Sequence, residues 1–271
     1  MPKKLKKSVV DSSLPEFANT VIQGDSSEVM KRFPDDCIDL TVSSPPYDNI
    51  RIYHGYNFEP EKIIDQLYRV TKPGGVVVWI MMDAVIAGSE SGSSFRQALY
   101  FKQVGFSLHD TMIWHKPFTR PNENDRRYTS SFEYMFVFCK DSQPKTFNPL
   151  LIPSITAGKS MTTVGFRKFD GSYVHEKRRA TLKVRPYKRL LNVWTIRQEI
   201  KKNPHPAAFP RKLAEMHIRT WSNEGDLILD PMCGSGTSLM IARYLKRNFV
   251  GIDVSNEYCE VSRAAVESVN A

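Results

Sequence analysis

The first half of the chain alternates apolar runs of strand length with a segment of helical periodicity. Residues 38–42 and 76–81 are typical of buried strands, and residues 63–68 place apolar side chains at helical spacing between them. Residues 72–75 (KPGG) are typical of the end of that helix. The order strand, helix, strand predicts a parallel βαβ unit. A later pair of strands is predicted at residues 112–114 and 133–138, with antiparallel pairing as one arrangement.

The C-terminal part repeats this pattern. Residues 210–221 have the apolar spacing of a helix, and residues 226–230 form a strand-like run that ends at a glycine-rich turn. A second predicted helix, residues 238–247, leads to another strand at residues 248–253. Both ends of the chain are therefore expected to contribute to one α/β domain with a doubly wound sheet.

The segment between these two parts is strongly basic. The whole chain of 271 residues is 41% hydrophobic, which allows a normal core, and its net charge of +9 favours a polyanionic partner. Residues 158–202 hold thirteen basic and three acidic side chains, so this window carries the positive excess. Aromatic side chains are interleaved with the cations, which suits contact with phosphates and bases. A solvated basic loop without a partner is the alternative.

Several classes of protein do not fit the composition. No run of 18 apolar residues occurs and no signal peptide is evident, so we expect a soluble protein of the cytoplasm and no membrane partner. The four cysteines form no C-x-x-C pair and predict reduced, mostly buried thiols. The six histidines show no metal-binding spacing, so we expect no metal cofactor.

A glycine turn follows the predicted strand 226–230 in the segment 230–237 (DPMCGSGT). Gly234 and Gly236 allow a tight turn with bare backbone, and the next helix offers unpaired N–H groups there. Asp253 ends the following strand, where a carboxylate can accept hydrogen bonds from a ribose. The turn is neither a P-loop nor a full dinucleotide motif. It fits a nucleoside without a pyrophosphate, or a tight turn with no ligand.

Residues 44–47 (SPPY) follow the strand 38–42. The two prolines stiffen the backbone, so that the Ser44 hydroxyl and a fixed carbonyl can accept hydrogen bonds from an exocyclic amino group, and Tyr47 can stack on a flat ring. Withdrawing the amine hydrogens localises the nitrogen lone pair for attack on a methyl donor that lies in line. The alternative is a proline-rich surface turn without a catalytic role, formed by Ser44, Pro45, Pro46 and Tyr47.

Together, segments 44–47 and 230–237 resemble the bacterial and phage amino-methyltransferases of DNA, which use S-adenosylmethionine. The order, with the tetrapeptide early and the glycine motif near the C-terminus, is the permuted arrangement called the β class, and the resemblance spans residues 20–265. It implies the Rossmann-like doubly wound mixed sheet of class I methyltransferases. Residues 1–140 would form the catalytic half, residues 141–202 an inserted basic target-recognition region and residues 203–271 the cofactor-binding half.

The resemblance also implies roles for individual residues. Asp25 matches an acidic motif near the adenine, and Asp253 matches the ribose ligand. Residues 203–210 match the segment that wraps the methionine end, although residues 207–209 depart from the usual His-Pro-Thr-Gln-Lys-Pro form. The implied cofactor-binding residues are Asp25, His205, Pro206, Phe209, Asp230, Pro231, Cys233, Gly234, Gly236, Thr237 and Asp253.

Serine at the head of the tetrapeptide resembles N4-cytosine enzymes, whereas N6-adenine enzymes usually carry aspartate there. We therefore favour N4 of cytosine in double-stranded DNA, with N6 of adenine as the alternative, a catalytically silent nucleic-acid-binding subunit as another and RNA modification as a third. The base must be flipped, and residues 48–56 are a candidate loop over it. A homodimer and a separate cognate restriction endonuclease are further expected partners. Candidate DNA-binding cations are Arg167, Lys168, Lys177, Arg178, Arg179, Lys183, Arg185, Lys188 and Arg189.

Overall fold

The computed structural model describes residues 15–47, 58–119, 126–160, 165–175, 183–199 and 210–269. The chain divides into two compact units. Unit 1 comprises Met1–Asn148 and Val193–Ala271, and unit 2 comprises Pro149–Asn192. Unit 1 contains an eight-stranded sheet with helices, and unit 2 contains two small strand pairs.

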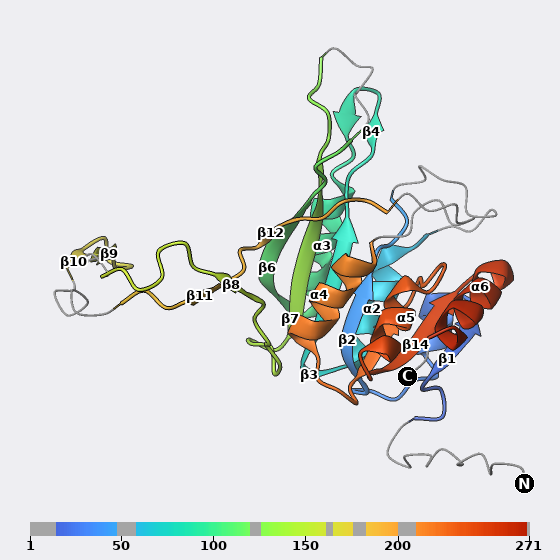
Figure 1. Cartoon of the computed structure of the whole chain (residues 1–271). Coiled ribbons are helices and arrows are strands. Elements are labelled where there is room, and N and C mark those ends of the chain that lie inside the picture. Colours follow the sequence, from blue (N-terminus) through green and yellow to red (C-terminus); the bar gives the residue numbers. More distant parts are fainter. Residues whose placement is uncertain are drawn as a thin grey trace, which may run out of the picture. The chain divides into compact units, whose positions relative to one another are not determined.

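The large sheet has the strand order β1-β14-β13-β2-β3-β7-β6-β12 (Figure 1). Within it, β7 is antiparallel to both neighbours and every other described pairing is parallel. The antiparallel pair β6–β7 is the later strand pair expected from the sequence. The strands are β1 (Thr20–Gln23), β14 (Asn248–Asp253), β13 (Leu227–Asp230), β2 (Ile38–Ser43), β3 (Thr71–Met81), β7 (Phe132–Lys140), β6 (Phe106–His115) and β12 (Val193–Thr195).

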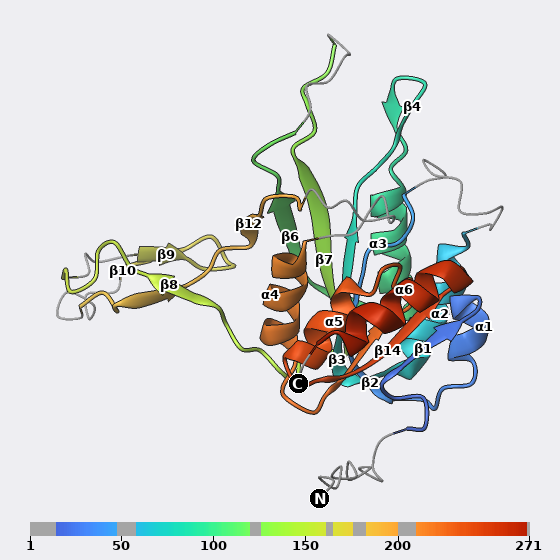
Figure 2. The ribbon, with the colours of Figure 1, turned by 45° about the vertical axis from the view of Figure 1, so that its right-hand side comes forward.

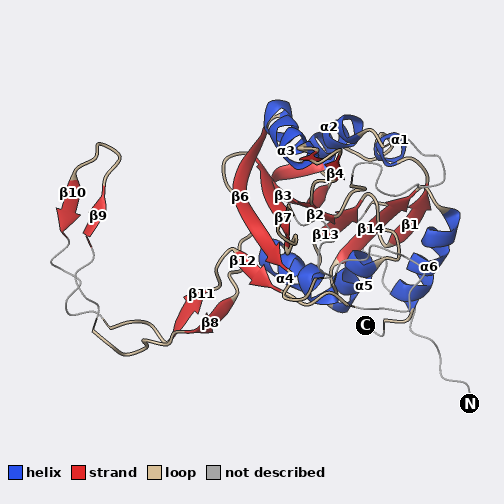
Figure 3. Cartoon of the chain, turned by 90° about the horizontal axis from the view of Figure 1, so that it is seen from above, coloured by secondary structure: helices blue, strands red, loops and turns tan. Residues whose placement is uncertain are grey.

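Helices cover both faces of this sheet (Figure 3). One face carries α1 (Ser26–Met30), α2 (Pro60–Val70) and α3 (Ser93–Val104), and the other carries α4 (Arg211–Trp221), α5 (Thr237–Tyr244) and α6 (Asn256–Glu267). The latter three lie side by side on the sheet (Figure 2). Two helical layers bury the central strands on both faces, so that consecutive residues of β2 and β3 are buried, the polar Thr41 and Ser43 among them. The doubly wound α/β sheet predicted from the sequence is confirmed.

The predicted βαβ unit is present as β2, α2 and β3, but one boundary differs. Residues 72–75 follow the end of the helix as predicted, since α2 stops at Val70, but they lie within β3, which begins at Thr71 and not at residue 76. The register shifts here, because Ile38 pairs with Thr71 whereas Leu40 pairs with Val76. The KPGG segment is therefore accommodated as an irregularity of the strand, with Gly74 at φ +72°. A short hairpin, β4 (Val85–Ile86) and β5 (Ser89–Glu90), follows β3.

Unit 2 consists of two antiparallel strand pairs. β8 (Leu151–Pro153) pairs with β11 (Tyr187–Arg189), and β9 (Gly165–Arg167) pairs with β10 (Tyr173–His175). The backbone N–H of Leu190 donates to the carbonyl of Leu150 at 2.8 Å, so the chain enters and leaves the strand pairs of this unit at adjacent positions. No described helix in the chain is both long and apolar enough to cross a membrane.

Candidate active site

Four neighbouring parallel strands of unit 1 end at one edge of the sheet. β1 leads into Asp25, β14 ends at Asp253, β13 ends at Asp230 and β2 leads into Ser44. Because these strands are adjacent in the order β1-β14-β13-β2, their carboxyl ends lie next to one another. In open α/β sheets, ligands bind at this edge. The fold thus brings together the glycine turn and the tetrapeptide, which are 186 residues apart at Ser44 and Asp230 in the chain.

The glycine turn between β13 and α5 is held against Asp253. The backbone N–H of Gly234 donates to Asp253 Oδ2, and that of Ser255 donates to Asp253 Oδ1, both at 2.9 Å. Gly236 caps α5 with a left-handed φ of +75°, and a Cβ there would lie 2.3 Å from Ser262 Oγ on α6. Glycine is therefore required at this position both by the backbone conformation and by the close approach of α6.

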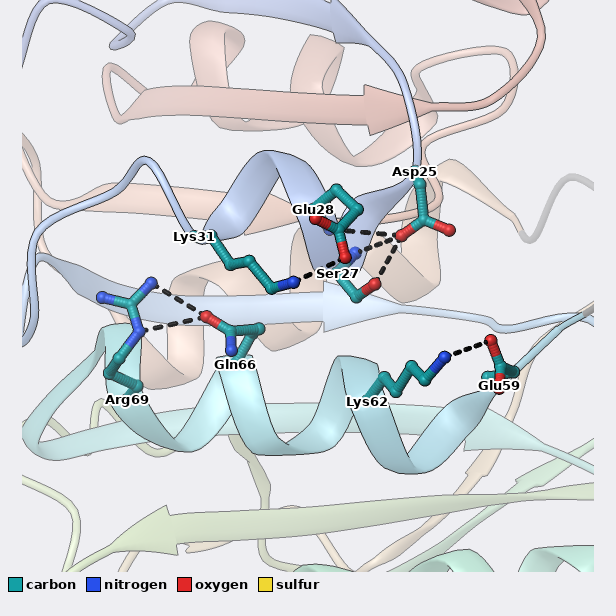
Figure 4. Close-up of polar contacts among 8 residues, drawn as sticks. All are labelled: Asp25, Ser27, Glu28, Lys31, Glu59, Lys62, Gln66 and Arg69. Carbon is teal, nitrogen blue, oxygen red and sulfur yellow. Dashed lines mark hydrogen bonds and ion pairs between the residues drawn. The ribbon is translucent and has the colours of Figure 1, made fainter.

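Asp25 lies at the start of α1 (Figure 4). Its Oδ1 accepts hydrogen bonds from the backbone N–H of Ser27 at 2.8 Å and from Ser27 Oγ at 2.6 Å, which caps the helix. The preceding Gly24 donates its N–H to the carbonyl of Asp253 at 2.9 Å. This backbone bond joins the ends of β1 and β14, so the carboxylates that follow the two strands occupy the same edge.

Asp230 is buried beneath the glycine turn. Its Oδ1 accepts from Ser43 Oγ at 2.8 Å and from the backbone N–H of Met232 at 3.2 Å, and its Oδ2 accepts from Ser238 Oγ. Burial raises the pKa of this carboxyl to about 6, although its hydrogen-bond donors act in the opposite direction. Asp230 therefore links β13, β2 and α5 from the interior of the site.

The tetrapeptide positions two hydroxyl groups close together. Ser44 Oγ lies 2.9 Å from the Tyr47 hydroxyl oxygen, and the Tyr47 hydroxyl donates to Glu133 Oε2 at 2.7 Å. Pro45 is buried, while Ser44, Pro46 and Tyr47 are half-buried. The Tyr47 ring packs against the apolar core of unit 1. The ring therefore has a defined orientation at the carboxyl end of β2.

Two charged residues beside the tetrapeptide, Glu133 and Lys116, belong to no motif of the sequence. Only 6% of Glu133 and 8% of Lys116 is exposed, and Lys116 Nζ donates to Glu133 Oε1. Glu133 on β7 pairs in register with Trp114 on β6, and the Lys116 ammonium lies 4.9 Å from the centre of the Trp114 ring. An acidic side chain at the start of an apolar strand, FEYMFVFCK, is the signal that was available.

Some of the other predicted residues lie within the described ranges and some lie outside them. His205, Pro206, Phe209, Lys177, Arg178, Arg179 and the loop 48–56 lie outside the described residues. Pro231, Cys233 and Thr237 are buried in or beside the glycine turn, and burial raises the pKa of the Cys233 thiol well above its usual value. Six of the predicted DNA-binding cations are described, and all six are exposed: Arg167, Lys168, Lys183, Arg185, Lys188 and Arg189. No cluster of three or more metal-binding side chains occurs in the described ranges.

The sheet order and its single reversed strand define the class I methyltransferase fold. The chain is similar in structure to PvuII DNA methyltransferase (cytosine-N4-specific), with a TM-score of 0.65 and 22% identity over 92% of this chain and 86% of that one. It is also similar to a putative DNA modification methylase of Thermus thermophilus complexed with S-adenosylmethionine, with a TM-score of 0.62 and 22% identity, covering 93% and 97%.

The sequence comparisons give the family. Residues 38–264 match the N6/N4 DNA methylase family. The chain is 46% identical to the orphan methyltransferase M.BamHII of Bacillus amyloliquefaciens over 88% of its own length and 92% of that protein, and 26% identical to the type II methyltransferase M.BglII of Bacillus subtilis over 93% and 70%. The chain therefore belongs to this family and is a DNA methyltransferase whose cofactor is S-adenosylmethionine.

Proposed function

We propose that this protein transfers a methyl group from S-adenosylmethionine to N4 of a cytosine at specific sites in double-stranded DNA. The observation that carries the proposal is the placement of Ser44. It follows β2, next to the glycine turn that follows β13, and its hydroxyl oxygen lies 2.9 Å from that of Tyr47. A serine there, in place of the aspartate usual in adenine enzymes, favours cytosine.

The residues at the sheet edge fit the cofactor. Carboxylates at the ends of neighbouring strands, Asp25 and Asp253, suit the adenine side and the ribose hydroxyls, respectively. The turn through Gly234 and Gly236 brings bare backbone and the first turn of α5 to the edge, where N–H groups can bind the carboxylate of the amino-acid part. We assign His205, Pro206 and Phe209 to the methionine end on their sequence positions alone.

Three other residues would support this cofactor site. Asp230 fixes the turn from inside through its bonds to Ser43, Met232 and Ser238. Pro231 and Cys233 fill the buried side of the same turn, and the Cys233 N–H donates to the Ile252 carbonyl at 2.9 Å. Thr237 begins α5 directly after the second glycine. In this arrangement the bound cofactor supplies an electrophilic methyl group next to the tetrapeptide.

The tetrapeptide residues have the roles of holding and polarising the base. The Ser44 hydroxyl and the Pro45 carbonyl accept the two hydrogens of the exocyclic amine, which localises its lone pair for attack on the methyl group. Pro46 stiffens the segment, and Tyr47 contacts the ring of the flipped base. The amine nitrogen would form a bond to the methyl carbon as the carbon–sulfur bond breaks, the electron pair of that bond would stay on sulfur, and the proton lost by the nitrogen would pass to water.

Unit 2 is the proposed target-recognition region. Its exposed cations would contact phosphates and base edges, with Tyr173 and Tyr187 exposed among them. Lys177, Arg178 and Arg179 are included on the basic sequence pattern. M.BglII is named a type II methyltransferase and M.BamHII an orphan methyltransferase. A cognate restriction endonuclease and a second copy of this chain are the two protein partners proposed for test.

The experiment uses purified protein, S-adenosylmethionine with a tritiated methyl group, and DNA of varied sequence, with RNA as a parallel substrate. The DNA is digested to nucleosides and the labelled nucleoside is identified. We expect label in N4-methylcytosine. Label in N6-methyladenine would retain a DNA amino-methyltransferase and overturn the assignment of cytosine from Ser44. Labelled RNA with unlabelled DNA, or measurable cofactor binding without transfer, would overturn the proposed function.

A further inference from the structure

A chain of hydrogen-bonded side chains runs from the tetrapeptide into the interior of unit 1. It begins at Ser44 Oγ, which lies 2.9 Å from the Tyr47 hydroxyl oxygen, and continues 2.7 Å to Glu133 Oε2. The other carboxylate oxygen, Oε1, accepts from Lys116 Nζ. The four side chains come from the end of β2, from β7 and from the residue after β6.

The register of the sheet explains why these residues meet. Glu133 on β7 lies opposite Trp114 on β6, and Lys116 is two residues beyond Trp114, which places all three on one side of the sheet. The Glu133 carboxylate is almost completely buried and the Lys116 ammonium is its counter-charge. The oxygens of a carboxylate that is paired with an ammonium group accept hydrogen bonds and donate none.

This ion pair sets the direction of every hydrogen in the chain. The Tyr47 hydroxyl has one hydrogen, and the Glu133 carboxylate, at 2.7 Å, competes for it better than the Ile80 carbonyl at 3.5 Å. Since the phenolic hydrogen points to Glu133, the Tyr47 oxygen must act as the acceptor toward Ser44. The Ser44 hydroxyl therefore donates its own hydrogen to Tyr47, and its oxygen lone pairs are left to accept a hydrogen from another group.

We propose that Glu133 and Lys116 are positioning residues that hold the Ser44 hydroxyl in the orientation in which it accepts a hydrogen from the target amine. The inference rests on the proposed function. A serine hydroxyl turned the other way would donate to the amine nitrogen and occupy the lone pair that attacks the methyl group. A carboxylate at this position would need no such control, because it has no hydrogen to donate. A serine hydroxyl needs this control of its orientation, and Glu133 provides it by fixing the direction of the Tyr47 hydrogen.

The test begins with Glu133→Gln. The amide oxygen must face the Lys116 ammonium, so the amide NH2 group faces Tyr47 and donates to it. The Tyr47 hydrogen then turns to Ser44, and the Ser44 hydrogen turns to the base. We expect kcat to fall about tenfold or more. KM for DNA and the Kd for S-adenosylmethionine should stay within about twofold, because the chain acts on the orientation of one acceptor.

Tyr47→Phe provides a second route if Glu133→Gln lowers the thermal melting temperature. It removes the link between Glu133 and Ser44 but keeps the ring, and we expect a similar loss in kcat. Ser44→Asp is the rescue: in its presence Glu133→Gln should have no further effect, because an acceptor-only side chain replaces the serine. Glu215→Gln on α4, whose carboxylate pairs with Lys212 and Arg219, is the matched control and should retain full activity.

The outcomes separate the inference from the proposed function. Wild-type protein is assayed first, and an absence of label on any exocyclic DNA amine would overturn both. If wild type transfers label, a kcat of Glu133→Gln and Tyr47→Phe equal to wild type would overturn the inference alone. Equal losses from Glu133→Gln in the wild-type background and in the Ser44→Asp background would do the same, since they would show that Glu133 acts independently of the serine hydroxyl.

Discussion

Asp230 is a carboxylate that the site holds inside the protein, where ionisation is disfavoured. Burial raises its pKa from 3.8 to about 6, so at this group the folded state binds a proton more tightly than the unfolded state. Its contribution to stability therefore falls as the pH rises from 3.8 to about 6. Above this range, ionisation of Asp230 lowers the free energy of unfolding by on the order of 3 kcal/mol relative to its value at low pH, where the carboxyl is protonated.

Asp230→Asn should remove this pH dependence. The amide carries no charge, and the Ser43 and Ser238 hydroxyls can rotate to pair with it. We expect the melting temperature of the variant, relative to wild type, to be higher by several degrees at about pH 8 than at about pH 4.5. Differential scanning fluorimetry across this range measures the difference, with the exposed Asp65→Asn as control. A pH-independent difference would show that Asp230 does not titrate in this window.

Gly236 and Gly225 differ in the space that is available for a Cβ atom. Both have positive φ, +75° and +88°, but a Cβ at 236 would lie 2.3 Å from Ser262 Oγ and 3.0 Å from Ser262 Cα, whereas a Cβ at 225 meets no atom within 4 Å. We expect Gly225→Ala to cost about 1 kcal/mol from backbone strain alone. Gly236→Ala should cost at least about 2 kcal/mol more, because α6 must move. Urea unfolding measures both.

The same pair of variants bears on the cofactor site. Since Gly236 caps α5 beside Asp253, a displaced turn should also weaken S-adenosylmethionine binding, which calorimetry measures. Gly225 lies before β13, at the opposite end of that strand from the turn, and its variant should bind the cofactor as wild type does. Equal affinities for both variants would contradict the assignment of the turn to the cofactor.

The elements differ in how far the sequence predicts them. β2, β3, β13 and β14 are predictable because burial on both faces concentrates apolar and β-branched residues in a segment of strand length. β12 is not, since its three residues gain their place by pairing with β6, from Val193 with Ile113 to Thr195 with His115. Because β6 and β12 are far apart in the sequence, their pairing produces no hydrophobic pattern within the three residues of β12. α2 was predictable from its apolar face, and its end at Val70 agrees with the helix stop predicted at residues 72–75.

The β9–β10 hairpin is an element with a testable charge. Arg167 and Lys168 are exposed at its turn, which Asp170 stabilises by accepting from the Ser172 N–H at 2.8 Å. If both cations contact phosphates, the double change Arg167→Gln and Lys168→Gln should reduce the slope of log K against log salt by about 2. Filter binding at several salt concentrations measures this slope. Lys212→Gln on α4 is the control, and an unchanged slope in the double variant would remove the hairpin from the DNA interface.

At the scale of the whole molecule, motif residues and their neighbours were predictable to different degrees. Ser44, Gly236 and Asp253 could be proposed as site residues because each lies at or just after the end of a recognisable strand. Glu133 and Lys116 could not, because their contact depends on the register of β7 against β6, which sequence patterning does not determine. A buried ion pair also looks, in the sequence, like two ordinary surface charges. The chemistry-bearing motifs are therefore visible before the structure, whereas the residues that orient them are not.

The division into two units predicts that cofactor binding and DNA binding can be separated. All residues of the buried apolar cluster lie in unit 1, and the Leu190 N–H donates to the Leu150 carbonyl at 2.8 Å. An Asn-Gly turn can therefore replace residues 151–189, because the hydrogen-bonded ends already have the spacing of a tight hairpin. The deleted segment holds ten basic and two acidic side chains, so the remainder is close to neutral.

We expect the variant to melt cooperatively and to bind S-adenosylmethionine as wild type does, but to lose DNA affinity by about a hundredfold or more in low salt. Calorimetry and fluorescence anisotropy measure the two affinities. Retained DNA affinity would place the main DNA contacts in unit 1, and lost cofactor binding would show that unit 1 depends on unit 2 for its fold.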